Sequence, residues 1–277
     1  MQILPSKELM PFIKHYLFLE SAGMSIKKLR LFSDGNMGVV FSFKSNLIFN
    51  IQSSGLTDTL PATFVYGQIN EFKDLCIVNQ ASLIIVVFHP AGLNQLLGIP
   101  ASELRDQIIN TQDLLGREGG LQIQERLSES NDIPTKLKIL NTFFAALAGR
   151  QIAAHDVLIN ASVNFILKNK GVNSIHQLVK YTGYTERHIE RVFIECIGFS
   201  PKKFGNIVRL HNFLKLLKSA SRQSNFTTVS HEAGYSDQSH LIKEFRKYTG
   251  ITPKEYLYKT NKLAVNFMEF PSLHSIT

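Results

Sequence analysis

Cysteine is scarce in this sequence: the 277 residues include only Cys76 and Cys196, far apart in the chain. Both lie among apolar residues, so we expect reduced core thiols, which excludes a disulfide framework or a cysteine metal site. Long hydrophobic runs are also missing, because the longest, such as Leu83–Phe88, are far below the about 20 residues that a transmembrane helix needs. Charged residues scattered through the amino-terminal segment exclude the apolar part of a signal peptide. We therefore expect a soluble, cytoplasmic protein without a membrane partner.

Histidine is rare in the first 150 residues, where only His15 and His89 occur. A transition-metal site in a β-barrel needs several histidines and a carboxylate at one place. A single histidine near a strand end is more often a structural residue. No Ser-His-Asp arrangement or pair of catalytic carboxylates can be assembled from the other residues. We therefore predict no enzyme activity, no catalytic residues, no metal and no cofactor.

Basic charge is confined to the second half of the chain, although the formal net charge of the whole is +8. Residues 1–150 contain thirteen basic and thirteen acidic residues, whereas residues 151–277 contain seventeen and nine. Basic charge in one segment indicates a polyanionic partner. A membrane surface would also attract it, but here the basic residues alternate with a buried apolar stripe. Nucleic acid is therefore the predicted partner.

Two stretches of the basic half, Leu178–Phe204 and Val229–Tyr256, are imperfect copies of each other. Each contains a Gly-Tyr-hydroxyl triplet and, further on, Gly, an apolar residue, a hydroxyl residue and Pro. The offset between the copies is 51 residues before the second helix of each and 52 after it, so the second copy holds one extra residue. An internal repeat of this period predicts one supersecondary unit used twice.

Each copy has the pattern of a helix, a short glycine turn and a second helix. The first helix ends at a glycine that can adopt positive φ, and Thr185 or Ser236 is predicted to cap the next helix. Proline, at Pro201 and Pro253, then occupies the first position of a further helix. Residues of the second helices at one face of a 3.6-residue period are apolar and are predicted to be buried: Ile189, Val192, Phe193 and Cys196, then Leu241, Phe245 and Tyr248.

At these residues the sequence resembles the DNA-binding domain of the AraC/XylS family of bacterial transcription factors. The string GYSDQSHLIKEFRKYTGITPKEY is similar to that family's second helix-turn-helix signature, and GFSP lies where the first one ends. The resemblance spans roughly residues 155 to 260. It implies a seven-helix domain in which the helices beginning at Thr185 and Ser236 enter successive major grooves on one face of promoter DNA. It also implies an activator that works with RNA polymerase.

The resemblance assigns DNA contacts to polar residues on the outer faces of these two helices. Arg binds guanine bidentately and Gln pairs with adenine, so the residue types suit base reading. Arg191 and Lys243 are the strongest candidates. The alternative is that such residues are surface charges paired with acidic neighbours, for example Glu190 or Glu244. The predicted DNA-binding residues are Glu186, Arg187, Glu190, Arg191, Gln238, Ser239, Lys243 and Lys247.

A helix over Lys202–Ser219, between the two copies, carries apolar residues on two sides and is therefore predicted to be buried. We expect it to brace the two DNA-reading units against each other. A polar loop, Ser219–Asn225, leads to the second copy, and Gly149–Asp156 is the predicted boundary between two domains. The tail Asn261–Thr277 shows no clear period, and its sequence predicts no element.

The first half is rich in short β-type runs separated by turn residues, which predicts a small barrel or sandwich. After His89, short helices are predicted at Ala91–Leu97 and Ser102–Ile109, and amphipathic helices at Leu121–Leu127 and Pro134–Ala148. This order resembles the cupin-like effector domains that precede the DNA-binding half in the AraC/XylS family. The predicted strands are His15–Glu20, Lys28–Phe32, Val39–Lys44, Leu47–Gln52, Thr63–Tyr66, Leu75–Val78 and Ser82–Phe88.

We therefore expect an α+β protein with a cupin-like effector-sensing or dimerisation domain at 1–150 and a double helix-turn-helix DNA-binding domain at 151–277. The predicted function is sequence-specific regulation of transcription, modulated by a small molecule or by homodimerisation. Many apolar residues in a neutral first half hint at an uncharged or lipid-like effector. One alternative is a ligand-independent regulator with a purely structural β domain. The other is a DNA-repair regulator that accepts alkyl groups on cysteine, which two separated apolar cysteines argue against.

Overall fold

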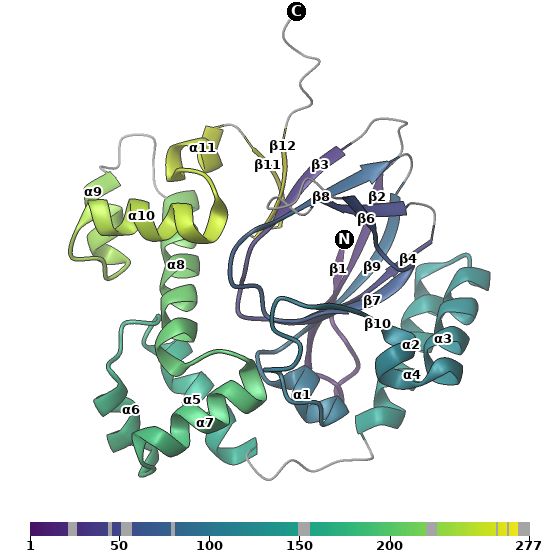
Figure 1. Ribbon diagram of the computed structural model, residues 1–277, viewed down its shortest axis with the longest axis horizontal. Coiled ribbons are helices and arrows are strands. Elements are labelled where there is room, and N and C mark those ends of the chain that lie inside the picture. Colours follow the sequence, from purple (N-terminus) through teal and green to yellow (C-terminus); the bar gives the residue numbers. More distant parts are fainter. Residues whose placement is uncertain are drawn as a thin grey trace, which may run out of the picture.

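Two antiparallel sheets of six strands form a β-sandwich in the amino-terminal half (Figure 1). The computed structural model describes residues 1–21, 27–43, 46–50, 57–78, 81–148, 156–219, 226–258, 260–264 and 266–270. Sheet A has the order β1-β2-β9-β4-β7-β10, and sheet B has the order β11-β12-β3-β8-β5-β6. The strands are β1 Gln2–Ile3, β2 Ile13–Ser21, β3 Lys27–Leu31, β4 Gly38–Ser42, β5 Asn46–Asn50, β6 Thr57–Thr59, β7 Thr63–Tyr66, β8 Lys73–Val78, β9 Ala81–Phe88, β10 Ile108–Asn110, β11 Asn261–Ala264 and β12 Phe267–Phe270.

Sheet A is buried on both faces, as the central strand β4 shows. Val39 and Phe41 pack toward helices, whereas Val40 between them packs toward sheet B. Successive side chains of a strand point to opposite faces, so a strand covered on both sides is apolar throughout. This is why β4, whose five residues are all buried, lacks the clean alternation of a half-exposed strand.

The described residues between β9 and α5 contain four helices, of which α1, α3 and α4 pack on the outer face of sheet A. Their bounds are α1 Gly92–Leu97, α2 Thr111–Leu115, α3 Arg117–Glu129 and α4 Ile133–Ala148. The seven predicted strands and three of the predicted helices are confirmed. The helix expected at Ser102–Ile109 is wrong: residues 101–106 form turns, and Ile108–Asn110 pair with β7 as strand β10. Asp106 has φ 58°, a left-handed conformation that a helix does not continue through.

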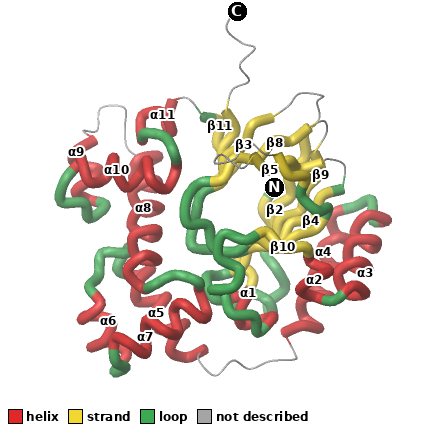
Figure 2. Tube along the Cα trace, in the orientation of Figure 1, coloured by secondary structure: helices red, strands yellow, loops and turns green. Residues whose placement is uncertain are grey.

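Apart from β11 and β12, the described elements of the carboxyl-terminal half are helices, and α8 runs between the others (Figure 2). Their bounds are α5 Asp156–Lys168, α6 Ile175–Thr182, α7 Glu186–Ile197, α8 Pro201–Ser219, α9 Phe226–Glu232, α10 Gln238–Thr249 and α11 Pro253–Tyr258. The predicted bracing helix is therefore confirmed as α8. The chain is an α+β protein, as expected. Most of the predicted boundary and of the polar loop, residues 149–155 and 220–225, lie outside the described residues.

After α11, a hairpin of β11 and β12 joins the amino-terminal sandwich (Figure 1). Strand β12 pairs antiparallel with β3, with Met268 opposite Arg30, so residues from the two ends of the sequence share sheet B. Met268 is fully buried in a core that also contains residues of α8 and α10. The helices are thus joined to the sandwich both before α5 and after α11.

Candidate nucleic-acid interface

The first helix-turn-helix unit consists of α6, a turn at Gly183, and α7. Ser174 and Gln177 form a capping box at the start of α6, in which the side chain of each accepts from the backbone N–H of the other. Gly183 ends α6 with φ 76°, a conformation that favours glycine. The Thr185 hydroxyl then accepts from the His188 N–H and caps α7. The glycine that ends α6 and the cap at Thr185 are as the sequence predicted.

The second unit consists of α9, a turn at Gly234, and α10, and it differs in its cap. The Asp237 carboxylate accepts from the N–H groups of Ser239 and His240, so the predicted cap at Ser236 is wrong by one residue. Hydrogen bonds to these N–H groups lower the pKa of Asp237 and keep it charged at the positive end of the helix. The extra residue of the second copy therefore lies in its turn, before the cap.

Helix α8 joins the two units through aromatic side chains at two points along its length. Phe204 near its start packs with Phe193 of α7, at 6.2 Å between ring centroids. Phe213, nearer its end, packs edge-on against Phe245 of α10 at 6.1 Å. All four rings are buried. The two reading helices, α7 and α10, are therefore both packed against a single helix, at positions nine residues apart.

A buried ion pair also holds α10 to α8. Arg209 of α8 donates to Glu244 of α10 at 3.0 Å, and the exposed fractions of the two side chains are 17% and 9%. The Tyr235 hydroxyl donates to the other Glu244 oxygen at 3.2 Å, and the Arg209 guanidinium lies 4.4 Å from the Tyr235 ring. Burial, with the charge of Glu244, raises the pKa of Tyr235, so the phenol remains a hydrogen-bond donor.

The predicted DNA-binding residues are all exposed on α7 and α10. Arg191 forms an ion pair with Glu195 at 3.1 Å, one turn along α7, with more than two-fifths of each side chain exposed. Exposed pairs of this kind contribute little stability, so the pair leaves Arg191 available to another partner. The exposed set is Glu186, Arg187, Glu190, Arg191, Gln238, Ser239, Lys243 and Lys247.

Lys247 differs from the other seven because it faces the amino-terminal half. It lines a polar cavity of about 490 Å³ together with Lys203 of α8 and with Glu71 and Asp106 of the sandwich. Lys203 in turn contacts the Asn70 side chain. Lys243, one turn earlier on α10, does not line this cavity. The two lysines therefore face different surroundings although the helical pattern placed both on the polar side.

The sequence did not reveal that Glu244 has a structural role, as the buried partner of Arg209. This carboxylate lies at the buried face of α10, three residues after Leu241 and one before Phe245. A charged residue within an apolar stripe is a signal that it has a buried partner. The partner itself, Arg209, could not be identified from the sequence because it lies 35 positions away on another helix.

A second cavity, of about 640 Å³, lies inside the sandwich. Its apolar walls come from both sheets and include Leu29, Val40 and Phe64. Its polar rim includes Lys14 and Asp34 of the sandwich and His211 and Lys215 of α8. Helix α8, which packs against α7 and α10, is therefore also part of the cavity wall.

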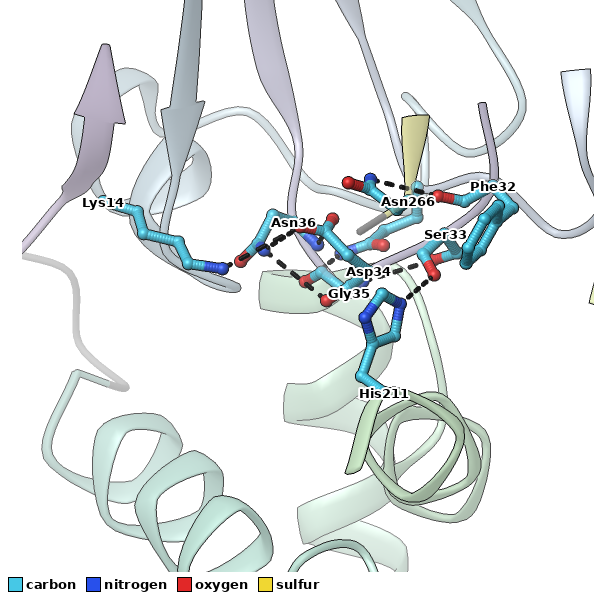
Figure 3. A network of polar contacts seen from close by, with 9 residues as sticks. Lys14, Phe32, Ser33, Asp34, Gly35, Asn36, His211 and Asn266 are labelled. Atoms are coloured by element: carbon cyan, nitrogen blue, oxygen red, sulfur yellow. Dashed lines mark hydrogen bonds and ion pairs between the residues drawn. The ribbon is translucent and has the colours of Figure 1, made fainter. Parts of the chain in front are cut away.

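A polar network joins the rim of this cavity to α8 (Figure 3). The ring of His211 donates from Nε2 to the Ser33 carbonyl at 2.8 Å. Asp34, next along the chain, binds the Asn36 side chain at 2.7 Å and lies 3.8 Å from the Lys14 amine. The Asn266 amide donates to the Phe32 carbonyl at 3.1 Å. The loop between β3 and β4 thus contacts α8 and the carboxyl-terminal hairpin at once.

Burial lowers the pKa of His211 below its ordinary value, with Lys14 and Lys215 acting in the same direction and Asp34 and the Ser33 carbonyl opposing. Below pH ~6.5 the unfolded histidine therefore binds more protons than the folded one. The free energy of unfolding should fall as the pH falls from about 6.5 toward the lower pKa of the folded state. We expect urea denaturation at pH 7.5 and 5.5 to show this fall, and His211→Gln to reduce it. His231→Gln, at an exposed histidine, is the control and should leave it unchanged.

Neither a membrane-spanning helix nor a metal-binding cluster occurs in the described parts of the chain. No helix there is long and apolar enough to cross a membrane. No group of three or more His, Cys, Asp or Glu side chains there could hold a metal ion.

A comparison with known families also finds a helix-turn-helix domain in this part of the chain. Residues 178–259 match a family described as a helix-turn-helix domain (HTH_18), and residues 1–110 match a domain of unknown function (DUF6597). The fold and the site thus define a protein with a DNA-binding helix-turn-helix domain. More narrowly, the domain is of the AraC type, and relatives that match part of the chain are transcriptional regulators.

Two relatives match parts of the chain. An uncharacterized HTH-type transcriptional regulator of Haemophilus influenzae is 28% identical over 113 residues, which are 36% of this chain and 37% of that protein. The lactose operon transcription activator of Staphylococcus xylosus is 27% identical over 99 residues, 35% of each protein. The chain spans little more than a third of the length of these relatives.

Solved structures of ToxT from Vibrio cholerae also align with the chain. An apo variant covers 90% of this chain and 97% of its own, with 12% identity and a TM-score of 0.48. A form with bound unsaturated fatty acid covers 88% and 95%, with 12% identity and a TM-score of 0.47.

Proposed function

We propose that this protein regulates transcription by placing α7 and α10 in successive major grooves of promoter DNA. The observation that carries the proposal is the repeated unit: two capped helices with exposed polar faces, both packed against α8. With 19 residues, α8 is about 28 Å long at 1.5 Å per residue. Successive major grooves on one face of a duplex are about 34 Å apart. The length of α8 is therefore of the same order as the groove spacing.

Within this proposal Arg191 and Lys243 read bases. The other predicted residues of α7 and α10 supplement them, except Lys247, which faces the sandwich. The two occupy the same distance from their helix caps, because Thr185 and Asp237 are 52 positions apart, as are Arg191 and Lys243. Both side chains can donate to guanine O6 and N7 in the major groove. Activation through RNA polymerase in the cytoplasm follows from the family and forms part of the proposal.

Selection from randomised duplex DNA tests the DNA-binding proposal. We expect the full chain to enrich one sequence with two specific segments about one helical turn apart. An Arg191→Ala/Lys243→Ala double variant should enrich no such sequence. A wild-type chain that folds and enriches nothing would contradict the proposal.

We further propose that a largely apolar small molecule binds in the sandwich cavity and alters DNA binding. The volume, about 640 Å³, lies in the range of small-molecule sites. Its walls are apolar, and α8 closes one side, so an occupant would touch the helix that fixes both reading helices. A ligand changes DNA affinity only if it binds the DNA-competent and the other state with different affinity.

A thermal-shift screen separates this proposal from a regulator whose β domain is only structural. Uncharged apolar molecules and amphiphiles with an anionic head should be tested side by side on the full chain. We expect at least one class to raise the unfolding temperature, and Val40→Phe, which places a larger side chain in the cavity, to reduce the rise. A screen without any shift would favour the ligand-independent alternative.

The alkyl-repair alternative is disfavoured by the surroundings of Cys196. Burial raises the pKa of this thiol to about 12, with the charges of Glu195 and Asp156 adding to the effect. The thiolate is the reactive form of cysteine, so Cys196 would react slowly at neutral pH. Thiol titration of the folded protein should show no rapidly reacting group at this position.

A further inference from the structure

Both reading helices contact the amino-terminal half at their carboxyl-terminal ends. Gly198 ends α7 with φ 83°, and Gly250 ends α10 with φ 72°. The two glycines are 52 positions apart and are therefore equivalent in the repeat. In each unit the segment that packs on this glycine comes from the sandwich or the loops that connect its strands.

The first contact is made by the backbone of Ala101, in the turns that follow α1. Its N–H donates to the Glu195 carbonyl in the last turn of α7, at 2.7 Å. Its own carbonyl oxygen would lie 2.9 Å from a Cβ atom at Gly198, which only glycine avoids. Ala101 is fully buried. The end of α7 is therefore packed closely against the amino-terminal half.

The second contact is made by the side chain of Arg30, on β3. Its Nη1 donates to the Thr249 carbonyl at the end of α10, at 3.3 Å. A Cβ atom at Gly250 would lie 2.5 Å from the same nitrogen and 2.5 Å from the Phe72 ring. A positive charge at a helix carboxyl terminus is favourable because it complements the helix dipole. Arg30 thus caps α10 from another part of the fold.

Arg30 is itself held in place on three sides. Asp74 accepts from its Nε at 2.5 Å and from its Nη2 at 2.7 Å, a bidentate arrangement. The rings of Phe72 and Phe270 lie 3.9 Å and 5.0 Å from the guanidinium carbon. Only 13% of the side chain is exposed. This arrangement gives the Arg30 guanidinium one position, from which it contacts α10.

The strands that carry this contact also form the wall of the sandwich cavity. Arg30 pairs with Asp74, and the next residues, Leu31 and Lys73, pair with each other. Leu31 and Lys73 line the cavity. Because successive residues of a strand face opposite sides, β3 and β8 present one side to the cavity and the other to α10.

We propose that the sandwich sets the spacing and angle of the two reading helices by holding both at their carboxyl-terminal glycines, with Arg30 as the residue that positions α10. The proposal rests on the DNA-binding function proposed above. Through α8 the two units are joined at one side only, and the contacts at Ala101 and Arg30 add a second connection. The amino-terminal half then sets the distance between α7 and α10. The distance between the two DNA segments that the protein prefers reports this effect.

Spacer variants of the selected duplex test this proposal. The number of base pairs between the two segments is changed by one or two, and affinity is measured by fluorescence anisotropy. The wild-type chain should prefer one spacer. Arg30→Met keeps an apolar stem against Phe72 and Phe270 but removes the contact with α10. It should bind the preferred spacer about tenfold more weakly, a typical coupling between two sites. Its affinity for a duplex with one segment should be unchanged.

Two further variants control this experiment. Lys28→Met removes a positive charge from an exposed residue of the same strand and should keep the wild-type spacer preference. Asp74→Asn preserves shape while weakening the hold on Arg30, and it replaces Arg30→Met if circular dichroism shows that Arg30→Met does not fold. A folded variant with an unchanged spacer preference, or with equal losses on all duplexes, would overturn the proposal. If the wild-type chain selects no sequence, the proposed DNA-binding function fails, and this inference fails with it.

Discussion

Replacing Arg209 by methionine should lower the free energy of unfolding by about 3–5 kcal/mol, the usual cost of removing one partner from a buried ion pair. Only 9% of the Glu244 side chain is exposed, so its charge cannot be well hydrated once Arg209 is gone. Tyr235 would still donate to one oxygen, and His240 lies 3.7 Å from the other. These contacts offset part of the loss. Urea denaturation followed by circular dichroism measures the change.

The same pair offers a compensating variant. Arg209→Met/Glu244→Leu removes both charges and fills the space with apolar atoms, so it should recover most of the lost stability. Lys202→Met, at an exposed residue of the same helix, should change stability by less than about 0.5 kcal/mol. A single variant as stable as the wild type, or a double variant no more stable than the single one, would show that the pair does not hold α10.

Local features of this fold could be predicted from the sequence because short-range chemistry determines them. The caps at Ser174 and Thr185, the glycines that end the helices, and the buried faces of α7 and α10 all depend on neighbours within four residues. The strands of the first half could be predicted for the same reason, since β-branched and aromatic runs between turn residues favour them. The repeat then identified the two units of the DNA-binding domain.

Features that depend on distant partners could not be predicted. The segment Asn261–Phe270 has no period of its own and becomes a hairpin because β3 offers it a free edge to pair with. The sequence predicts a helix that ends at Ile109, but pairing of residues 108–110 with β7 makes this segment a strand. The Ser236 prediction failed because two neighbouring residues can both cap a helix, and only the register of α10 shows that Asp237 does so.

The contacts of Arg30 and Asp74, which join the two halves, also could not be predicted from the sequence. Arg30 and Asp74 lie in strands whose sequence reveals only that they are polar positions. Their bidentate contact and the contact with Thr249, 219 positions away, require the folded arrangement of three elements. The helical pattern of α10 likewise gave Lys243 and Lys247 the same polar character, although Lys247 faces the sandwich.

This difference between the two lysines leads to a matched pair of variants. Lys243→Ala should weaken binding to the selected duplex by about 1–3 kcal/mol, the contribution of a good contact with a base. Its binding to random DNA should change much less, because a base contact contributes only at the correct sequence. Lys247→Ala removes the same charge one turn later on the same helix. Because Lys247 lines the cavity with Glu71 and Asp106, its loss should change binding to the selected duplex far less.

The two variants together decide which face of α10 meets the DNA. If Lys243→Ala weakens binding to selected and random duplexes equally, Lys243 contacts a phosphate group and does not read a base. If Lys247→Ala has the larger effect, the face of α10 that reads DNA is the one now turned toward the sandwich. The sandwich would then have to move away from α10 before DNA binds, and Arg30→Met should strengthen DNA binding instead of weakening it. Anisotropy titrations of the three variants on one duplex distinguish these arrangements.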